Sequence, residues 1–255
     1  MPTSASPTRK LAAVGAVVAL VVAVIAIGIA VGKAVEGGRD TGESGAAAST
    51  GSQGDAAQQK MFDDLAEKTS RRTAGDPLAV GKKDAPVVLV EYADYACSFC
   101  GRFTRETQPE LVKKYVDAGT LRIEFRNFPV FGADSERAAR ASWAAGQQGR
   151  FWQLHDTLYA KTRKGGDLAE DKLVELARAS GVPDLDRFRT DLGSAGAERA
   201  LKKDQDEGYR LGVQSTPSFL VNGRPISGAQ PTEVFAQAVE DAAAKAGAKG
   251  SGAGE

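Results

Sequence analysis

The sequence predicts an α/β fold in which a small sheet is interrupted by a block of helices. An apolar, β-branched run at 87–92 is typical of a strand buried on both faces. Helical spacing then persists from residue 135 to residue 211, in about five segments with no strand between them. Short apolar runs on either side of Asn222-Gly223 indicate a hairpin, and an amphipathic helix follows at 231–246.

The composition excludes several function classes. The 255 residues include 33 acidic and 33 basic side chains, and this balance gives no reason to expect nucleic acid as a partner. Two cysteines and one histidine are too few ligands for a zinc site, which needs about four. We therefore expect no metal and no bound cofactor.

An uncharged segment at 11–31 follows a short polar tail at 1–10. As a helix it would be about 31 Å long, close to the hydrocarbon thickness of a bilayer. We therefore predict an uncleaved transmembrane anchor, with the tail on the cytoplasmic side. The alternative is a cleaved signal peptide, whose apolar core is usually only about 7–15 residues long.

The remaining chain divides into a linker and one folded domain. Residues 32–75 are rich in Gly, Ala and Ser, which predicts a flexible linker with a short amphipathic helix at 61–72. The folded domain is predicted at 76–246, with the helical insertion at about 134–212. The tail at 247–255 is expected to be disordered.

The elements before the helical block alternate between strand and helix. Residues 78–81 are predicted to form a short edge strand. A helix is expected at 97–118, kinked or interrupted by Pro109. The alternation at 121–128 then predicts a second long strand.

Cys97 and Cys100 are the only cysteines, and they stand where a buried strand meets a helix. Unpaired N–H groups and the helix dipole at that position favour a thiolate, so Cys97 is the predicted nucleophile. Cys100, one turn later, is placed to resolve a mixed disulfide. The alternatives are a zinc site, a c-type haem site (disfavoured by Gly101 in place of histidine), two inert buried thiols and a structural disulfide.

Glu91 lies six residues before Cys97, in the middle of the predicted buried strand. A carboxylate there is costly unless it is paired or protonated. One interpretation is an acid that relays the proton of Cys100 during exchange. The other is that Glu91 reaches solvent, or pairs with Lys82 or Lys83.

Three other polar features are interpreted as structural. Asp94 is expected to be a solvated loop residue, and the charges at 202–207 a solvated helix face. His155 lies in an aromatic-rich helix, where a lone histidine is usually a packing residue. The alternative is a second charge that modulates Cys97.

The domain resembles the DsbA-like thiol:disulfide oxidoreductases over about residues 76–246. That resemblance implies a thioredoxin fold with an inserted helical domain. The features that carry it are Cys97-Ser98-Phe99-Cys100, Glu91 six residues earlier, Phe151-Trp152 with His155-Asp156, and Ser-Thr-Pro-Ser-Phe-Leu-Val-Asn-Gly at 215–223.

The resemblance also implies roles for single residues. Pro217 would be a cis-proline packed beside the cysteines, although only about 5–6% of X-Pro bonds in folded proteins are cis. Thr216 would offer backbone groups to a substrate peptide that adds as an extra strand. Glu91 matches the family's buried, proton-relaying acid.

The chain departs from the family between the cysteines. Many strong oxidants of the family have Pro-His there, whereas this chain has Ser98-Phe99. One stabiliser of the Cys97 thiolate is therefore missing, which leaves the oxidising power open. Phe99 instead supplies an apolar surface for unfolded polypeptide.

We therefore expect a single-pass membrane protein whose extracytoplasmic domain introduces disulfides into exported, reduced proteins. A chain without further cysteines suits an oxidising compartment, because it cannot form wrong disulfides. The resemblance implies reoxidation by a membrane quinone-linked partner of the DsbB or vitamin-K-epoxide-reductase type. The alternatives are a reductase or isomerase with the same residues, and a non-catalytic chaperone or binding module.

Overall fold

The computed structural model describes residues 47–251. The polar tail predicted at 1–10 and the anchor predicted at 11–31 lie outside the described residues. Within the described range, no helix is both long enough and apolar enough to cross a membrane.

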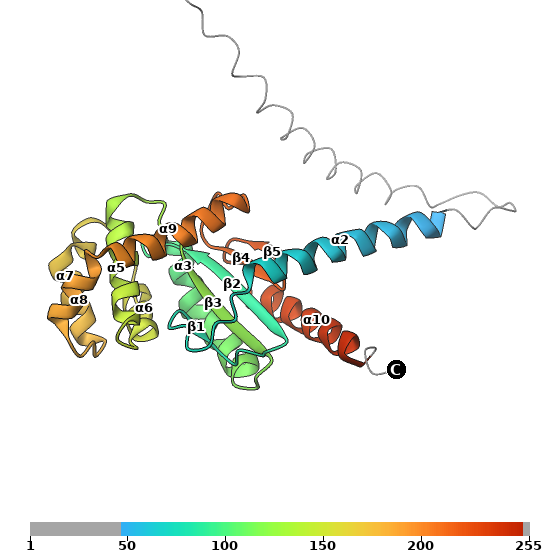
Figure 1. The fold of residues 1–255 in the computed structure, drawn as a ribbon, viewed down its shortest axis with the longest axis horizontal. Coiled ribbons are helices and arrows are strands. Elements are labelled where there is room, and N and C mark those ends of the chain that lie inside the picture. Colours follow the sequence, from blue (N-terminus) through green and yellow to red (C-terminus); the bar gives the residue numbers. More distant parts are fainter. Residues whose placement is uncertain (1–46, 252–255) are drawn as a thin grey trace, which may run out of the picture. The chain divides into compact units, whose positions relative to one another are not determined.

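Five strands form one sheet in the described part of the chain, in the order β1-β3-β2-β4-β5 (Figure 1). The central strand β2 (Val87–Ala93) runs parallel to β3 (Leu121–Asn127) and antiparallel to β4 (Ser218–Val221). β1 (Ala79–Val80) and β5 (Arg224–Ser227) are antiparallel edge strands. All seven residues of β2 are buried, as its apolar sequence predicts.

The turn between β4 and β5 is the predicted Asn-Gly hairpin turn. Asn222 and Gly223 have φ angles of 42° and 79°, the left-handed values that a tight hairpin requires at both central positions. The side-chain oxygen of Asn222 also accepts a hydrogen bond from the N–H of Val88 at 2.8 Å. The turn is thereby fastened to the central strand.

The helical run after the cysteines changes its winding around Pro109. It consists of α3 (Ser98–Arg102), the π-helical segment η2 (Phe103–Thr107), α4 (Gln108–Leu111) and a second π-helical segment, η3 (Val112–Val116). Pro109 lies in the first turn of α4 and has no N–H to donate to the preceding turn. The predicted interruption therefore takes the form of π-helical winding on both sides of α4.

The predicted helical block contains five α-helices between residues 133 and 210, all within the described range. They are α5 (Ala133–Gly146), α6 (Phe151–Tyr159), α7 (Glu170–Ala179), α8 (Leu185–Leu192) and α9 (Ala195–Arg210). Figure 1 shows α5–α8 gathered beside the sheet. Their shared apolar core reaches the cysteines and includes Cys97, Cys100, Phe125, Ala141, Phe151, Leu154, Leu158, Tyr159, Leu173 and Phe188.

The last helix, α10 (Thr232–Ser251), packs on the sheet face that η2, α4 and η3 also cover. Phe103, Phe219 and Phe235 form its aromatic centre, with ring centroids 4.5–5.0 Å apart. The helix continues beyond residue 246, so the tail predicted to be disordered at 247–255 is helical up to Ser251.

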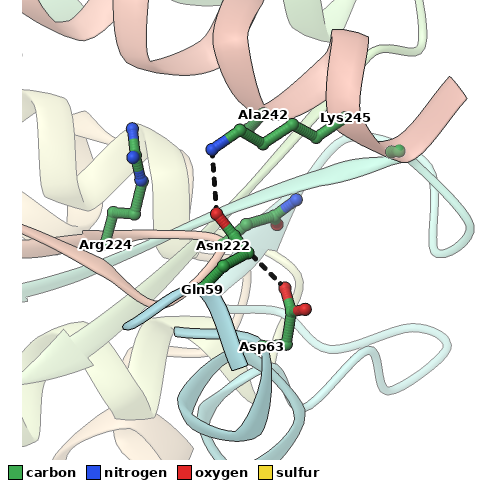
Figure 2. Close-up of a pocket in the computed structure, with 7 residues that line it drawn as sticks. Gln59, Asp63, Asn222, Arg224, Ala242 and Lys245 are labelled. Carbon is green, nitrogen blue, oxygen red and sulfur yellow. Dashed lines mark hydrogen bonds between the residues drawn. The ribbon is translucent and has the colours of Figure 1, made fainter. Parts of the chain in front are cut away.

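The segment before the domain contains the short helix expected at 61–72, but this helix begins earlier, at Ala47, and ends at Thr69, where the rest of the segment was predicted to be a flexible linker. Helix α2 (Ala47–Thr69) occupies much of it, and Leu65 packs on the sheet face opposite α10. Lys245 of α10 donates a hydrogen bond to Gln59 of α2 at 2.8 Å (Figure 2). Composition alone predicted a tether because the contacts that stabilise this helix come from distant residues.

α2 also lies directly against the hairpin turn. A Cβ atom added to Gly223 would lie only 1.9 Å from the carbonyl oxygen of Phe62. The guanidinium of Arg224 lies 5.5 Å from the centre of the Phe62 ring. Gly223 therefore serves both the turn and the close approach of α2.

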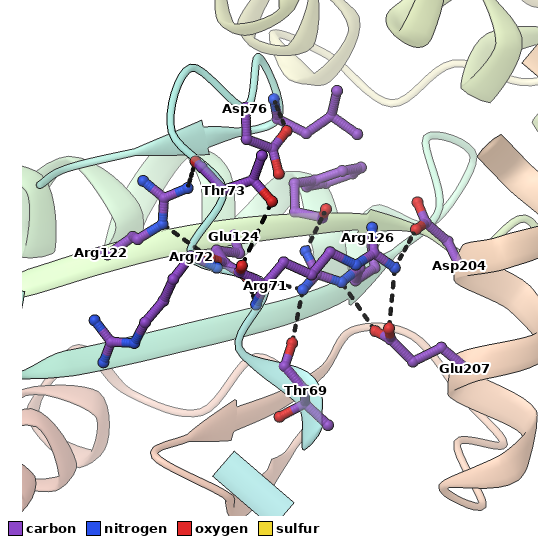
Figure 3. A network of polar contacts seen from close by, with 12 residues as sticks. Thr69, Arg71, Arg72, Thr73, Asp76, Arg122, Glu124, Arg126, Asp204 and Glu207 are labelled. Atoms are coloured by element: carbon purple, nitrogen blue, oxygen red, sulfur yellow. Dashed lines mark hydrogen bonds and ion pairs between the residues drawn. The ribbon is translucent and has the colours of Figure 1, made fainter. Parts of the chain in front are cut away.

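A buried polar network joins β3, α9 and the segment after α2 (Figure 3). Arg126 is fully buried and forms ion pairs with Glu124 at 2.8 Å and with Glu207 at 2.9 Å. Arg71 forms ion pairs with Asp204 at 2.7 Å and with Glu207 at 3.0 Å. These buried charges need partners because isolated charges are costly in the interior.

This network corrects one prediction. The solvated face expected at 202–207 was wrong for Asp204 and Glu207, which turn inward to the arginines. Lys202 and Asp206 do form an exposed pair, 2.9 Å apart. Helical periodicity placed these charges on α9, but the arginines that pair with them lie far away in the sequence.

Candidate active site

Cys97 is held at the start of α3 by the loop that follows β2. Its backbone is extended, with φ −82° and ψ 118°, and it caps the helix: its Sγ accepts a hydrogen bond from the N–H of Cys100 at 3.4 Å. This is a position at which helix N–H groups and the helix dipole stabilise an anion. The local sequence therefore gives Cys97 an environment that favours the thiolate.

The two thiols are both free, and their environments differ. A hydrogen bond from the Cys100 thiol, with help from the backbone N–H groups of Cys100 and Phe99, lowers the pKa of Cys97 to about 6 despite partial burial. Burial and the neighbouring Cys97 thiolate raise the pKa of Cys100 well above its ordinary range. Near neutral pH, Cys97 is therefore the thiolate and Cys100 remains protonated.

The segment before β4 completes the surroundings of Cys97. The Thr216-Pro217 peptide bond is cis, the form that the family resemblance implies. When protonated, the Sγ of Cys97 donates a hydrogen bond to the carbonyl oxygen of Thr216 at 3.3 Å. The structure thus brings Thr216-Pro217 and Cys97 together from opposite ends of the domain.

Glu91 is fully buried in β2. Neither of its carboxylate oxygens has a hydrogen-bond partner among the described residues, so it pairs with neither Lys82 nor Lys83. Burial, together with the charge of Cys97, raises the pKa of Glu91 to about 8. At neutral pH it is therefore an acid that holds a proton close to the thiol pair.

Phe99 is the exposed member of the cysteine segment, with 56% of its surface accessible. The guanidinium of Arg102 lies 5.3 Å from the centre of its ring. Phe99 thus presents an aromatic surface beside Cys97, at the position where the sequence predicted a contact with substrate.

Comparison with known proteins agrees with this geometry. A family model described as thioredoxin matches residues 73–241, which covers every residue of the site. The chain belongs to the thioredoxin family. Within it, the probable disulfide bond formation protein D of Bacillus cereus is 34% identical over 151 residues, which span 57% of this chain and 69% of that protein.

Two further similarities come from Bacillus subtilis. Its disulfide bond formation protein D is 29% identical over 156 residues, or 60% of this chain and 70% of that protein. The crystal structure of oxidised BdbD superposes with a TM-score of 0.61 at 26% identity and covers 66% of this chain and 93% of that structure. This member of the thioredoxin family is therefore a DsbA-like thiol:disulfide oxidoreductase.

One residue close to the cysteines was misjudged from the sequence. Asp94, predicted to be a solvated loop residue, is only 1% exposed. Its carboxylate accepts hydrogen bonds from the N–H groups of Ala96 and Val130, at 2.7 and 2.6 Å. The bond to Ala96, two residues along the chain, forms an Asx-turn, which Asp favours locally, whereas the burial of Asp94 depends on the distant Val130.

His155 is fully buried among aromatic rings, in agreement with a packing role. Its ring lies 5.2 Å from that of Phe125 and 5.0 Å from that of Tyr159. Burial lowers the pKa of His155, although the hydrogen bond to Asp156 opposes the shift. A neutral imidazole supplies no charge to Cys97.

No group of three or more metal-binding side chains comes together among the described residues. The arrangement around Cys97 brings together one activated thiol, one protonated thiol and one buried acid.

Proposed function

We propose that this protein is an extracytoplasmic disulfide donor, which oxidises pairs of thiols in exported proteins by means of a Cys97–Cys100 disulfide. The observation that carries the proposal is the contrast between the two cysteines. Cys97 has a thiolate stabilised at a helix N-terminus, whereas Cys100 is buried and holds its proton. A stabilised thiolate on the reduced enzyme favours transfer of the disulfide to substrate.

The exchange proceeds in two steps. A substrate thiolate attacks the Sγ of Cys97, the Cys97–Cys100 bond breaks, and Cys100 leaves as a thiolate. The second substrate thiolate then attacks the substrate sulfur of this mixed disulfide, and Cys97 leaves as a thiolate. The substrate loses two electrons and gains a disulfide, while the enzyme disulfide is reduced to two thiols.

Glu91 supplies the proton that Cys100 needs in the first step. Its pKa of about 8 keeps the carboxyl group protonated at neutral pH. The emerging Cys100 thiolate is buried, and burial favours its neutral form. Proton transfer from Glu91 to Cys100 therefore removes a buried negative charge from sulfur as the mixed disulfide forms.

Thr216 and Phe99 are the proposed substrate contacts. While Cys97 is protonated, the Thr216 carbonyl accepts a hydrogen bond from its thiol. Ionisation or oxidation of Cys97 removes that donor, so the carbonyl becomes available to a substrate strand that pairs alongside the Thr216-Pro217 segment. The exposed ring of Phe99 then offers apolar contact to the unfolded chain.

The proposed location and partner follow from the family. The catalytic domain acts outside the cytoplasmic membrane, carried by the anchor predicted at 11–31. A membrane quinone-linked reoxidase, of the DsbB or vitamin-K-epoxide-reductase type, accepts the two electrons and restores the Cys97–Cys100 disulfide. A reductase would use the same residues with the opposite direction of electron flow, and an isomerase would use them to rearrange disulfides with no net electron flow.

The proposal is tested by trapping substrates in cells. In the Cys100→Ala variant the Cys97 thiolate attacks a disulfide of an exported protein, one substrate sulfur bonds to Cys97 and the other leaves as a thiolate. Because Cys100 is absent, no enzyme thiol can release the substrate, so exported proteins are expected to accumulate in covalent complexes through Cys97. The double variant Cys97→Ala/Cys100→Ala is the matched control and should trap none. Absence of complexes in the Cys100→Ala strain would contradict the proposal and favour a binding module with a structural disulfide.

A further inference from the structure

The carboxylate of Asp94 accepts four hydrogen bonds, although Asp94 lies in a loop. Oδ1 of its carboxylate accepts from the N–H of Ala96 and from the hydroxyl of Ser135, both at 2.7 Å. Oδ2 accepts from the N–H groups of Val130 and Phe131, at 2.6 and 3.2 Å. Four donors from three segments therefore hold one buried carboxylate.

We infer that Asp94 is a positioning residue of the active site, which holds the Cys97 loop against the segment leading into the helical insertion. The inference rests on the proposed function only in that it takes Cys97 as the reactive thiol. None of the contacts of Asp94 involves the sulfur of Cys97 directly, so its action passes through the backbone.

On the cysteine side, Asp94 shapes the loop through two bonds. Its side chain accepts from the N–H of Ala96, and its backbone carbonyl accepts from the N–H of Cys97 at 3.0 Å. These bonds set the direction in which the chain enters α3. They thereby fix Cys97 as the residue whose Sγ faces the N–H of Cys100.

On the other side, Asp94 holds the connection between β3 and α5. Val130 and Phe131 lie in this connection, and these residues are 39% and 59% exposed. Such an exposed segment has little packing of its own to keep it in place. Ser135, by contrast, is fully buried in the first turn of α5 and anchors the same carboxylate to the insertion.

The negative charge of Asp94 raises the pKa of Cys97, whereas its positioning of the loop lowers that pKa. A carboxylate near a thiol disfavours the thiolate, whereas correct placement at the helix N-terminus favours it. Other titratable groups at this junction are Glu91, Cys100, His155 and the phenols of Tyr95 and Tyr159. Burial lowers the pKa of His155 and raises the pKa of each of the others, and of the two thiols only Cys97 has a lowered pKa, at about 6.

The test measures the rate of alkylation of Cys97 by iodoacetamide against pH in the full-length, reduced protein. Asp94→Asn keeps the shape of the side chain but removes the charge and leaves one acceptor oxygen for four donors. We expect the midpoint to shift upward by about one unit, towards the ordinary thiol value of about 8.5. A lowered or unchanged midpoint would show that the positioning effect of Asp94 does not outweigh the effect of its charge, and either result overturns the inference.

Two further variants keep the test decisive. Ser135→Ala removes one hydrogen bond from the same carboxylate but leaves the cysteine loop held, so its midpoint should equal that of the wild type. An equal rise in Ser135→Ala would assign the effect to general loosening and would overturn the inference. If Asp94→Asn does not fold, Asp94→Ser decides: it retains an acceptor for Ala96 but cannot reach Val130 and Phe131, and its midpoint should also rise.

The pH dependence of alkylation reports the ionisation of the Cys97 thiol and does not require oxidase activity. Failure of the Asp94 inference would leave substrate trapping by Cys100→Ala intact. Failure of the proposed function would appear as absent trapping, with the response of Cys97 to Asp94 unchanged.

Discussion

The Sγ of Cys97 donates a hydrogen bond to the carbonyl oxygen of Thr216, 3.3 Å away, although 119 positions separate the two residues. The contact joins the start of α3 to the cis-peptide segment before β4. It places the reactive sulfur beside a backbone edge to which a substrate strand can add. In the proposed function, substrate recognition and thiol chemistry therefore share one location.

The first prediction concerns the reactivity of Cys97 in the wild-type protein. Because its pKa is lowered to about 6, the rate of alkylation should rise through pH 6 and level off above it. Cys100 should remain unmodified, since burial raises its pKa. Mass spectrometry of the alkylated peptides distinguishes the two cysteines. A midpoint near 8.5 would contradict the proposed thiolate stabilisation.

Glu91→Gln is predicted to stabilise the protein at high pH. The pKa of Glu91 rises from about 4.5 to about 8 on folding, so its contribution is intact below pH 4.5 and is lost as pH rises through 8. Glutamine titrates nowhere in this range. Denaturant unfolding at pH 9 should therefore show the variant more stable by about 2 kcal/mol or more, with little difference at pH 4.

The same substitution should slow turnover several-fold, because glutamine has no proton to give to Cys100. An unchanged rate of dithiol oxidation would reduce Glu91 to a structural residue.

Glu124→Gln is the control for the stability prediction, and its effect on stability should have the opposite sign. Burial opposes ionisation of Glu124, but hydrogen bonds from Arg122 and Arg126 lower its pKa to about 2, so its stabilising contribution is present above pH 4.5. Glu124→Gln should therefore lose stability at neutral pH.

The sequence predicted the strands and the thiol pair well, because these depend on local patterns. A few consecutive residues are enough to recognise the apolar run of β2, the Asn222-Gly223 turn and the C-x-x-C spacing. Asp204 and Asp94 were misjudged because their burial depends on partners far away: Arg71 for the first, Val130 for the second. Sequence periodicity shows which side of a helix a residue occupies, but not what will cover that side.

Gly223→Ala is predicted to weaken the docking of α2. The added Cβ would lie 1.9 Å from the carbonyl oxygen of Phe62, in addition to the strain of a positive φ. Gly149→Ala is the matched control, since Gly149 also has a positive φ but no atom within 4 Å of the added Cβ. The free energy of unfolding should fall by about 1–3 kcal/mol more for Gly223→Ala. Equal losses would show that α2 does not rest on the turn.

Arg126→Met is predicted to cost about 3–5 kcal/mol of stability, because it leaves Glu124 and Glu207 buried with fewer partners. Lys202→Met removes an exposed i,i+4 pair with Asp206 and should cost only about 0.3–0.5 kcal/mol. Thermal or denaturant unfolding measures both. Similar losses for the two variants would contradict the central place of Arg126 in the network.

The central claim is that the Cys97–Cys100 pair donates its disulfide, and its reduction potential tests this most directly. The potential is measured by equilibrating the full-length protein with glutathione buffers of known ratio. A stabilised Cys97 thiolate favours the reduced form, so we predict a value near the DsbA end of the scale, at about −120 mV. A value near that of thioredoxin, at about −270 mV, would make the protein a reductase and contradict the account.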